Sequence, residues 1–206
     1  MSGGSATPEG TLSIAGHECK VVFNIQAGLP VVFLHGSSYS SDIWERLKVT
    51  DFLAEKKIPF LALNMPYGSK SYCKPKTRNM EVNIRVAKES ILQVFGHASP
   101  ILVGSSIGGH IALEYATRYA VKGLLLTSPV NSLTKMLERA YPRFTFPTTI
   151  IYGSEDEIVP LKEMKLLAGK LQSSRLKIYE SAGHSAYIKY PDKFKQDLLD
   201  LYLAAK

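Results

Sequence analysis

The chain has 206 residues, of which 45% are hydrophobic and 21% are charged, and its formal net charge is +7. This composition is ordinary for a globular protein and suits one domain, residues 1–206, with a sizeable core. It excludes a membrane-spanning helix, because no stretch approaches the ~20 consecutive apolar residues that such a helix needs. Residues 1–10 lack the basic start and the apolar segment of a secretory signal, so we expect a flexible leader on a cytoplasmic protein.

Short apolar segments alternate with segments of helical spacing along the whole chain. In chain order, the predicted strands cover residues 11–14, 20–26, 31–34, 59–63, 101–103, 124–126, 148–152 and 176–179. The predicted helices cover residues 42–53, with an interruption near Val49–Thr50, and residues 80–95, 111–116, 132–140, 161–171 and 192–203. This alternation predicts an α/β fold with a mostly parallel central sheet and helices on both faces. In such a sheet the active site gathers at the carboxyl ends of the strands.

The basic residues form two groups, one between Lys70 and Arg85 and one near the C-terminal end. No nucleic-acid-binding motif accompanies them, so we interpret them as a solvated surface and expect no nucleic-acid partner. The two cysteines, Cys19 and Cys73, lie in neither a metal-binding nor a redox spacing and are expected to be free thiols. The sequence therefore predicts no metal site and no cofactor.

The chain is organised around the segment from Ile101 to Gly109, where an apolar strand is followed almost at once by a helix. Between them, Gly104, Ser106 and Gly108 form the pattern Gly-x-Ser-x-Gly. This pattern is typical of a nucleophile elbow, in which a serine occupies a strained turn between strand and helix. The pattern also occurs by chance in glycine-rich turns, but the strand before it and the helix after it favour Ser106 as a nucleophile.

Asp156 and His184 each follow a later predicted strand. Together with the strand end at Leu34–Gly36, the order Ser106, Asp156, His184 resembles the α/β-hydrolase superfamily, in which nucleophile, acid and base follow one another in this order. The resemblance covers nearly the whole chain. It implies an α/β-hydrolase fold with a minimal cap and a Ser-His-Asp catalytic triad, and the small size is similar to that of the single-domain members of the superfamily.

The residue types suit the chemistry that the resemblance implies. A serine hydroxyl is a poor nucleophile until a base removes its proton, and the imidazole of His184 gains and loses a proton near neutral pH. Asp156 would accept the other ring N–H and stabilise the imidazolium. Glu155 and Glu157 flank Asp156, and the alternative role for Asp156 itself is a surface turn residue or a helix N-cap. The resemblance selects Asp156, because the family has a Gly-x-x-Asp turn that matches residues 153–156.

The tetrahedral intermediate also needs donors that are fixed before its negative charge develops. The elbow supplies the backbone N–H of Ile107, at the start of a helix. By resemblance, the second donor is the backbone N–H of Ser37, and His35 holds the loop that carries it.

Three residues are candidates for contact with the substrate. Tyr67 stands in a turn where many α/β-hydrolases have glycine, and it faces either the pocket or the loop surface. Met136 and Tyr141 lie in the short segment between Pro129 and Pro147, where a small cap leaves the site open, although core packing is the commoner role for such residues.

The sequence therefore predicts a serine hydrolase, similar to carboxylesterases, that cleaves small-molecule esters of small to medium acyl groups. One alternative keeps the triad but acts on a thioester, amide or acyl-lysine. The other is a non-catalytic binding protein on the same scaffold, because fold alone does not fix function. The sequence does not indicate an oligomeric state.

Overall fold

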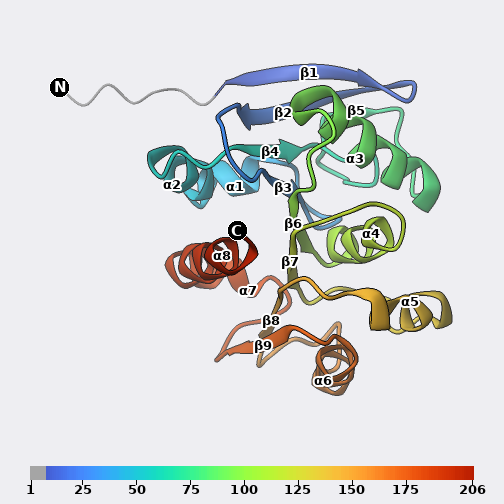
Figure 1. Ribbon diagram of the computed structural model, residues 1–206, viewed down its shortest axis with the longest axis vertical. Coiled ribbons are helices and arrows are strands. Elements are labelled where there is room, and N and C mark those ends of the chain that lie inside the picture. Colours follow the sequence, from blue (N-terminus) through green and yellow to red (C-terminus); the bar gives the residue numbers. More distant parts are fainter. Residues whose placement is uncertain (1–7) are drawn as a thin grey trace.

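The computed structural model describes residues 8–206, and nine strands of these residues form one sheet with helices on both sides (Figure 1). The sheet order is β1-β2-β4-β3-β6-β7-β8-β9, and β5 pairs with β2 beside this path. The strands are β1 (Glu9–Ile14), β2 (His17–Asn24), β3 (Val31–Leu34), β4 (Phe60–Leu63), β5 (Cys73–Lys74), β6 (Ile101–Ser105), β7 (Gly123–Thr127), β8 (Thr148–Gly153) and β9 (Ser174–Tyr179).

The six strands from β4 to β9 along this order are parallel, whereas β1, β2 and β5 pair in antiparallel fashion. Every residue of β3, β4, β6, β7 and β8 is buried, as expected for strands covered on both faces. The predicted fold class, an α/β-hydrolase fold with a mostly parallel sheet, is confirmed.

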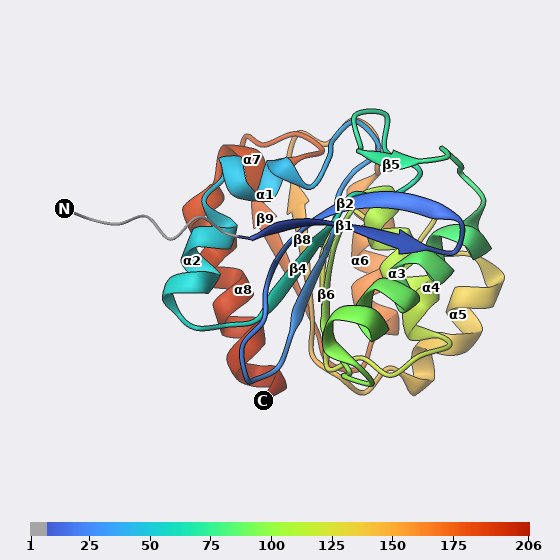
Figure 2. The same ribbon diagram turned by 90° about the horizontal axis from the view of Figure 1, so that it is seen from above.

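Two helical layers cover the sheet, as Figures 1 and 2 show. One layer contains α1 (Asp42–Arg46), α2 (Val49–Glu55), α7 (Ala186–Lys189) and α8 (Pro191–Ala205). The other contains α3 (Met80–Phe95), α4 (Ile107–Ala116), α5 (Lys135–Ala140) and α6 (Leu161–Lys170). Strand β6 packs against both layers, because Ile101 and Val103 belong to the core under α8 while Leu102 belongs to the core under α4.

The observed elements differ from the predicted ones mainly at their ends. Strand β1 begins at Glu9, so the expected leader is wrong for residues 9–10, and residues 1–7 lie outside the described part of the chain. The predicted helix 42–53 is interrupted, as expected, and forms two helices, with the break at Lys48, which adopts a left-handed conformation with φ of 57°. Among the described residues, no helix has both the length and the apolar character required to cross a membrane.

The expectation of free thiols is wrong, because a disulfide joins Cys19 to Cys73. The two residues are 54 positions apart in the sequence but face each other in the β2–β5 pair, with their Cα atoms 3.9 Å apart. Strand β5 has only two residues. Such a short strand leaves no period in the sequence from which this pairing could be predicted.

Candidate active site

Ser106 lies at the turn between β6 and α4 with a φ of 55°, a backbone conformation that residues with a side chain rarely adopt. The two glycines of the motif allow the close approach of strand and helix. A Cβ atom on Gly104 would lie 2.6 Å from the Cα of Gly109, and one on Gly108 would lie 2.7 Å from the carbonyl oxygen of His35. Both distances are shorter than real Cβ contacts, so only glycine fits at these two positions.

The partly buried imidazole of His184 pairs with the buried carboxylate of Asp156. The Nδ1 atom of His184 lies 2.9 Å from Oδ2 and 3.1 Å from Oδ1 of Asp156, and the Asp156 side chain has no exposed surface. The same Oδ1 accepts hydrogen bonds from the backbone N–H groups of Ile158 at 2.9 Å and Val159 at 3.0 Å. The neighbouring glutamates are exposed, so Asp156 is the acidic residue of this turn that contacts the imidazole.

The pKa of Asp156 lies below its ordinary value. Burial acts to raise this pKa, but polar contacts with the adjoining Ser128 hydroxyl, the Val159 N–H, His184 and the Ile158 N–H outweigh it. Asp156 is therefore ionised at neutral pH. An ionised carboxylate keeps a proton on Nδ1 of His184 and leaves Nε2 of the neutral ring as a base.

The loops after three parallel strands bring these residues to one edge of the sheet. β6 ends next to Ser106, β8 ends before Asp156, and β9 ends before His184. A Cβ atom on Gly153 would lie 2.7 Å from the carbonyl carbon of Ala182, and the N–H of Glu155 donates to the oxygen of Ala182 at 2.9 Å. The loop that carries His184 therefore packs directly on the turn that carries Asp156.

The orientation of the peptide group between Gly36 and Ser37 is fixed by its carbonyl oxygen. That oxygen lies 2.8 Å from Nδ1 of His35 and 3.1 Å from the backbone nitrogen of Tyr39. In a trans peptide the C=O and N–H groups point in opposite directions, so the N–H of Ser37 is directed away from both donors. Among the described residues, the N–H of Ser37 makes no hydrogen bond, and that of Ile107, the first residue of α4, makes none either.

His35 is completely buried and holds this loop as a neutral imidazole. Its Nε2 accepts a hydrogen bond from the N–H of Met65 at 3.0 Å, so Nδ1 carries the ring proton and donates to Gly36. Burial lowers the pKa of His35 to about 4. The hydroxyl of Tyr67 donates to the carbonyl of His35, and the N–H of Ser69 donates to the carbonyl of Ser37 at 2.8 Å.

Two of the three predicted substrate contacts need correction. Tyr67 is 4% exposed and holds the His35 loop, while Tyr141 has no exposed surface and donates its hydroxyl to the carbonyl of Ser132. Neither side chain is available to a substrate in this structure. Met136, on α5, is 48% exposed and stays a candidate. Aromatic residues near a pocket and aromatic residues in a core have the same sequence signature, which explains the error.

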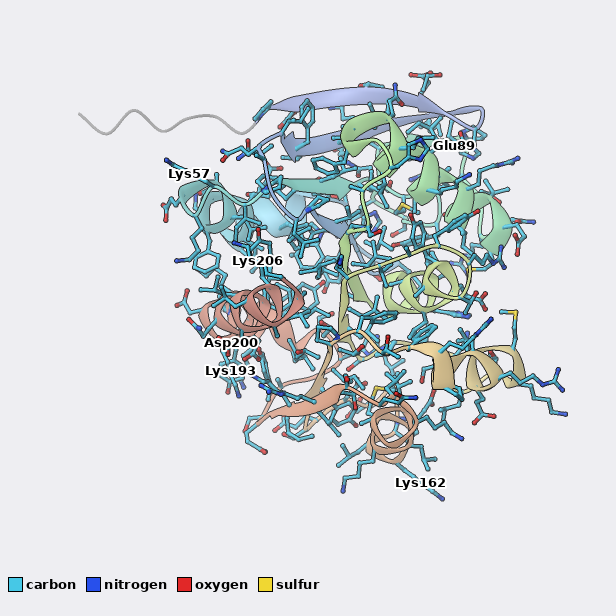
Figure 3. The ribbon with its side chains drawn as sticks, viewed as in Figure 1. Lys57, Glu89, Lys162, Lys193, Asp200 and Lys206 are labelled. Atoms are coloured by element: carbon cyan, nitrogen blue, oxygen red, sulfur yellow. A yellow bond between two sulfur atoms is a disulfide. The ribbon has the colours of Figure 1, made fainter. Side chains whose placement is uncertain are left out.

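A groove of about 380 Å³ lies between the loops that follow β7 and β8. It is lined by Asn131, Leu133, Thr134, Pro160, Lys162, Glu163 and Leu166. The N–H of Val130, next to this lining, donates to the carbonyl of Ser106 at 3.4 Å. Residues 131–134 form one side of the groove and residues 160–166 form the other, where Lys162 projects outward from α6 (Figure 3). The sequence did not indicate this groove, because its two sides come from segments about 30 residues apart.

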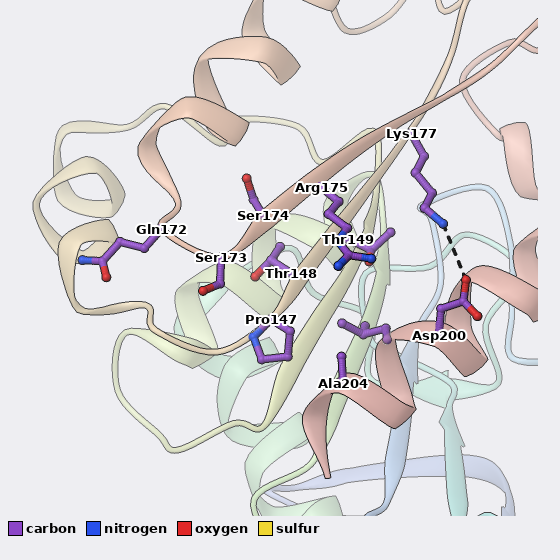
Figure 4. A pocket seen from close by; sticks show the side chains of 11 residues that line it. Pro147, Thr148, Thr149, Gln172, Ser173, Ser174, Arg175, Lys177, Asp200 and Ala204 are labelled. Atoms are coloured by element: carbon purple, nitrogen blue, oxygen red, sulfur yellow. Dashed lines mark ion pairs between the residues drawn. The ribbon is translucent and has the colours of Figure 1, made fainter.

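A second cavity, of about 300 Å³, lies away from these residues (Figure 4). It is formed at the starts of β8 and β9 and along the C-terminal half of α8, so it lies at the opposite ends of the strands from Ser106. Its polar wall includes Lys177 and Asp200, whose charged groups are 3.8 Å apart. In the described part of the chain, no cluster of three or more His, Cys, Asp or Glu residues is placed to hold a metal ion.

Comparison with known proteins gives consistent results. Residues 31–147, more than half of the chain, match the sequence model of the family described as "Alpha/beta hydrolase family". "Protein ABHD14A" of Danio rerio is 28% identical over 174 residues, which are 84% of this chain and 63% of that protein, so the chain spans less than two thirds of this relative. The rat protein named "Putative protein-lysine deacylase ABHD14B" is 26% identical over 82% of this chain and 81% of its own length.

Among solved structures, a "predicted CIB-like hydrolase" from Thermoplasma acidophilum superimposes with a TM-score of 0.84 at 21% identity. The match covers 96% of this chain and 98% of that one. At this level of identity the likeness concerns the fold alone.

Proposed function

The chain belongs to the alpha/beta hydrolase family, and on this premise we propose that it is a serine hydrolase that cleaves carboxylic esters of small to medium acyl groups. In this proposal Ser106 is the nucleophile, His184 the general base and acid, and Asp156 the residue that orients His184. The backbone N–H groups of Ser37 and Ile107 form the oxyanion hole. The proposed reaction uses no cofactor.

The proposed reaction has two halves. In the first, Oγ of Ser106 attacks the carbonyl carbon of the ester while Nε2 of His184 takes the serine proton. The negative charge on the carbonyl oxygen is stabilised by the two N–H groups, and His184 then gives the proton to the departing alcohol. In the second half, water attacks the acyl-enzyme, His184 takes the water proton, and the proton returns to Ser106 as the acid leaves.

The observation that carries this proposal is the pairing of Nδ1 of His184 with the buried carboxylate of Asp156 at the same sheet edge as the strained Ser106. A buried carboxylate on Nδ1 is the partner that holds the tautomer of a triad histidine and stabilises its imidazolium, whereas a histidine on the surface has no such role for it. Among the described residues, no hydrogen bond joins Ser106 to Nε2 of His184. Such bonds are often long in enzymes without substrate and shorten when substrate binds.

A fluorophosphonate probe tests the proposal directly. The wild-type protein should be labelled and should hydrolyse p-nitrophenyl acetate, whereas Ser106→Ala should not be labelled and should lose about 10⁴-fold or more in kcat. Ser173→Ala is the matched control, because Ser173 is exposed and lies at the opposite end of the sheet. Folded wild-type protein that neither reacts with the probe nor hydrolyses the ester would overturn the enzyme assignment in favour of a binding protein.

The second candidate keeps the same residues and changes the substrate to acyl-lysine. It is favoured by the similarity to the protein named "Putative protein-lysine deacylase ABHD14B". Comparing kcat/KM for p-nitrophenyl acetate with kcat/KM for an acetyl-lysine peptide separates the two. Hydrolysis of the peptide by wild type but not by Ser106→Ala supports the second candidate, and hydrolysis of the ester alone supports the first.

A further inference from the structure

Tyr187 carries a buried hydroxyl in the core that contains α7 and α8. Tyr187 lies on α7, three positions after His184, and has no exposed surface. Among the described residues its hydroxyl makes no hydrogen bond. A buried hydroxyl without a partner lowers stability, and phenylalanine would fill the same space without that loss. Packing therefore does not explain a tyrosine at this position.

Three segments lie near Tyr187: the end of β6 before the nucleophile, the loop after His184, and the loop after β3 that carries Ser37. Ser105 precedes the nucleophile, and its side chain lies on the same face of β6 as those of Ile101 and Val103, which belong to the core that contains Tyr187. Ser185 follows the base and lies two positions before Tyr187. Burial raises the pKa of Tyr187, and contact with these two serines partly offsets the rise. The hydroxyl of Tyr39, from the loop after Ser37, donates to Oγ of Ser185 at 3.4 Å. A Cβ atom placed on Gly36 would be 3.7 Å from Oγ of Ser105.

The ring of Tyr187 is held rigidly. It stacks on Trp44, with ring centroids 5.2 Å apart and an angle of 26° between the planes, and it packs against Phe194 at 5.6 Å. Both of these neighbours are fully buried. The tyrosine hydroxyl therefore has a fixed position, whereas a serine hydroxyl moves by one rotation about χ1. Such a rotation of Ser105 or Ser185 would bring a hydrogen-bond partner to the tyrosine.

We propose that the Tyr187 hydroxyl is a positioning group, which links the segment of the nucleophile to the segment of the base through Ser105 and Ser185. This inference rests on the proposed function. The link keeps Nε2 of His184 in line with Oγ of Ser106 while a proton passes between them. Tyr187 itself touches neither the substrate nor the reacting atoms. Its loss therefore lowers turnover and leaves substrate binding unchanged.

The test compares two tyrosine-to-phenylalanine variants. Tyr187→Phe should lower kcat for p-nitrophenyl acetate roughly 10-fold with little change in KM, because small errors in alignment are costly to proton transfer. Its midpoint of urea unfolding should equal or exceed that of wild type. Tyr179→Phe is the control, because the Tyr179 hydroxyl is also buried but donates to Oδ2 of Asp197 at 2.8 Å. This control should lower the midpoint and leave kcat unchanged.

A double-mutant comparison shows whether the link runs through the serines. If it does, Ser105→Ala combined with Ser185→Ala lowers kcat less in the Tyr187→Phe background than in wild type. Wild-type kcat in Tyr187→Phe overturns the inference, and so does a loss of kcat accompanied by a lower unfolding midpoint. These results leave the proposed function standing. A wild-type protein without Ser106-dependent hydrolysis overturns the proposed function instead.

Discussion

Replacing Gly108 by alanine should lower both stability and turnover, because the added methyl group collides with the backbone of Leu34 and His35 at the end of β3. Its Cβ atom would lie 2.7 Å from the carbonyl oxygen of His35 and closer still to the oxygen of Leu34. Cβ atoms essentially never come within 3.0 Å of such atoms. Because the obstacle is the end of β3 and not a flexible side chain, β3 and the start of α4 must separate by roughly 1 Å to restore ordinary contact.

That separation moves Ile107 relative to Ser37, the two proposed oxyanion donors. Overpacking of a tight contact costs about 1–3 kcal/mol of unfolding free energy, and a 1 Å displacement near reacting groups costs about 10²-fold in rate. We therefore expect Gly108→Ala to lose about 2 kcal/mol in urea unfolding and about 10²-fold in kcat for p-nitrophenyl acetate.

Gly169→Ala provides the matched control. Gly169 lies within α6, and a Cβ atom placed on it meets nothing within 4 Å. Alanine at this helical position should stabilise the protein by about 0.5–1 kcal/mol without changing kcat. If Gly108→Ala is as stable and as active as Gly169→Ala, the steric account of the elbow is refuted.

Two further predictions concern the titratable residues of the site. Asp156→Asn should lower kcat about 10⁴-fold, while Glu157→Gln, which changes an exposed neighbour in the same turn, should keep wild-type kinetics; equal effects of the two substitutions would contradict the assignment of Asp156. The pKa of His35 falls from 6.5 to about 4 on folding, so between these values the unfolded chain binds more protons and stability rises with pH. This group should contribute roughly 3 kcal/mol to the rise in unfolding free energy from pH 4 to pH 6.5, and urea titrations of His35→Asn should lack that contribution. An unaltered pH dependence in His35→Asn would show that another group is responsible.

Buried strands could be predicted from the sequence because the signal was local. The run Val31–Leu34 is apolar at every position, which is typical of a strand covered on both faces, and it ends just before His35 and Gly36. The same reasoning failed for β5 and α7, whose two and four residues are too few to establish a period. The pairing of Cys19 with Cys73 depends on β5 and was therefore missed as well.

In the candidate site, too, the features set by neighbouring residues could be predicted, and those set by distant segments could not. The glycines around Ser106 and the turn before Asp156 are dictated by backbone constraints that extend over a few residues, so a short motif contains them. The surroundings of Tyr67, Tyr141 and Tyr187 depend on segments far away in the sequence. No pattern within the chain distinguishes a tyrosine that holds a loop from one that meets a substrate.

The fixed peptide between Gly36 and Ser37 has a consequence for inhibition. Its carbonyl oxygen is engaged by groups of the chain itself, the ring of His35 and the backbone N–H of Tyr39, so folding alone sets its orientation. A boronic acid that mimics the tetrahedral intermediate would therefore meet a preorganised N–H group at the proposed oxyanion hole, with little loop entropy lost on association. Its binding should follow a single exponential, without a slow isomerisation of the complex.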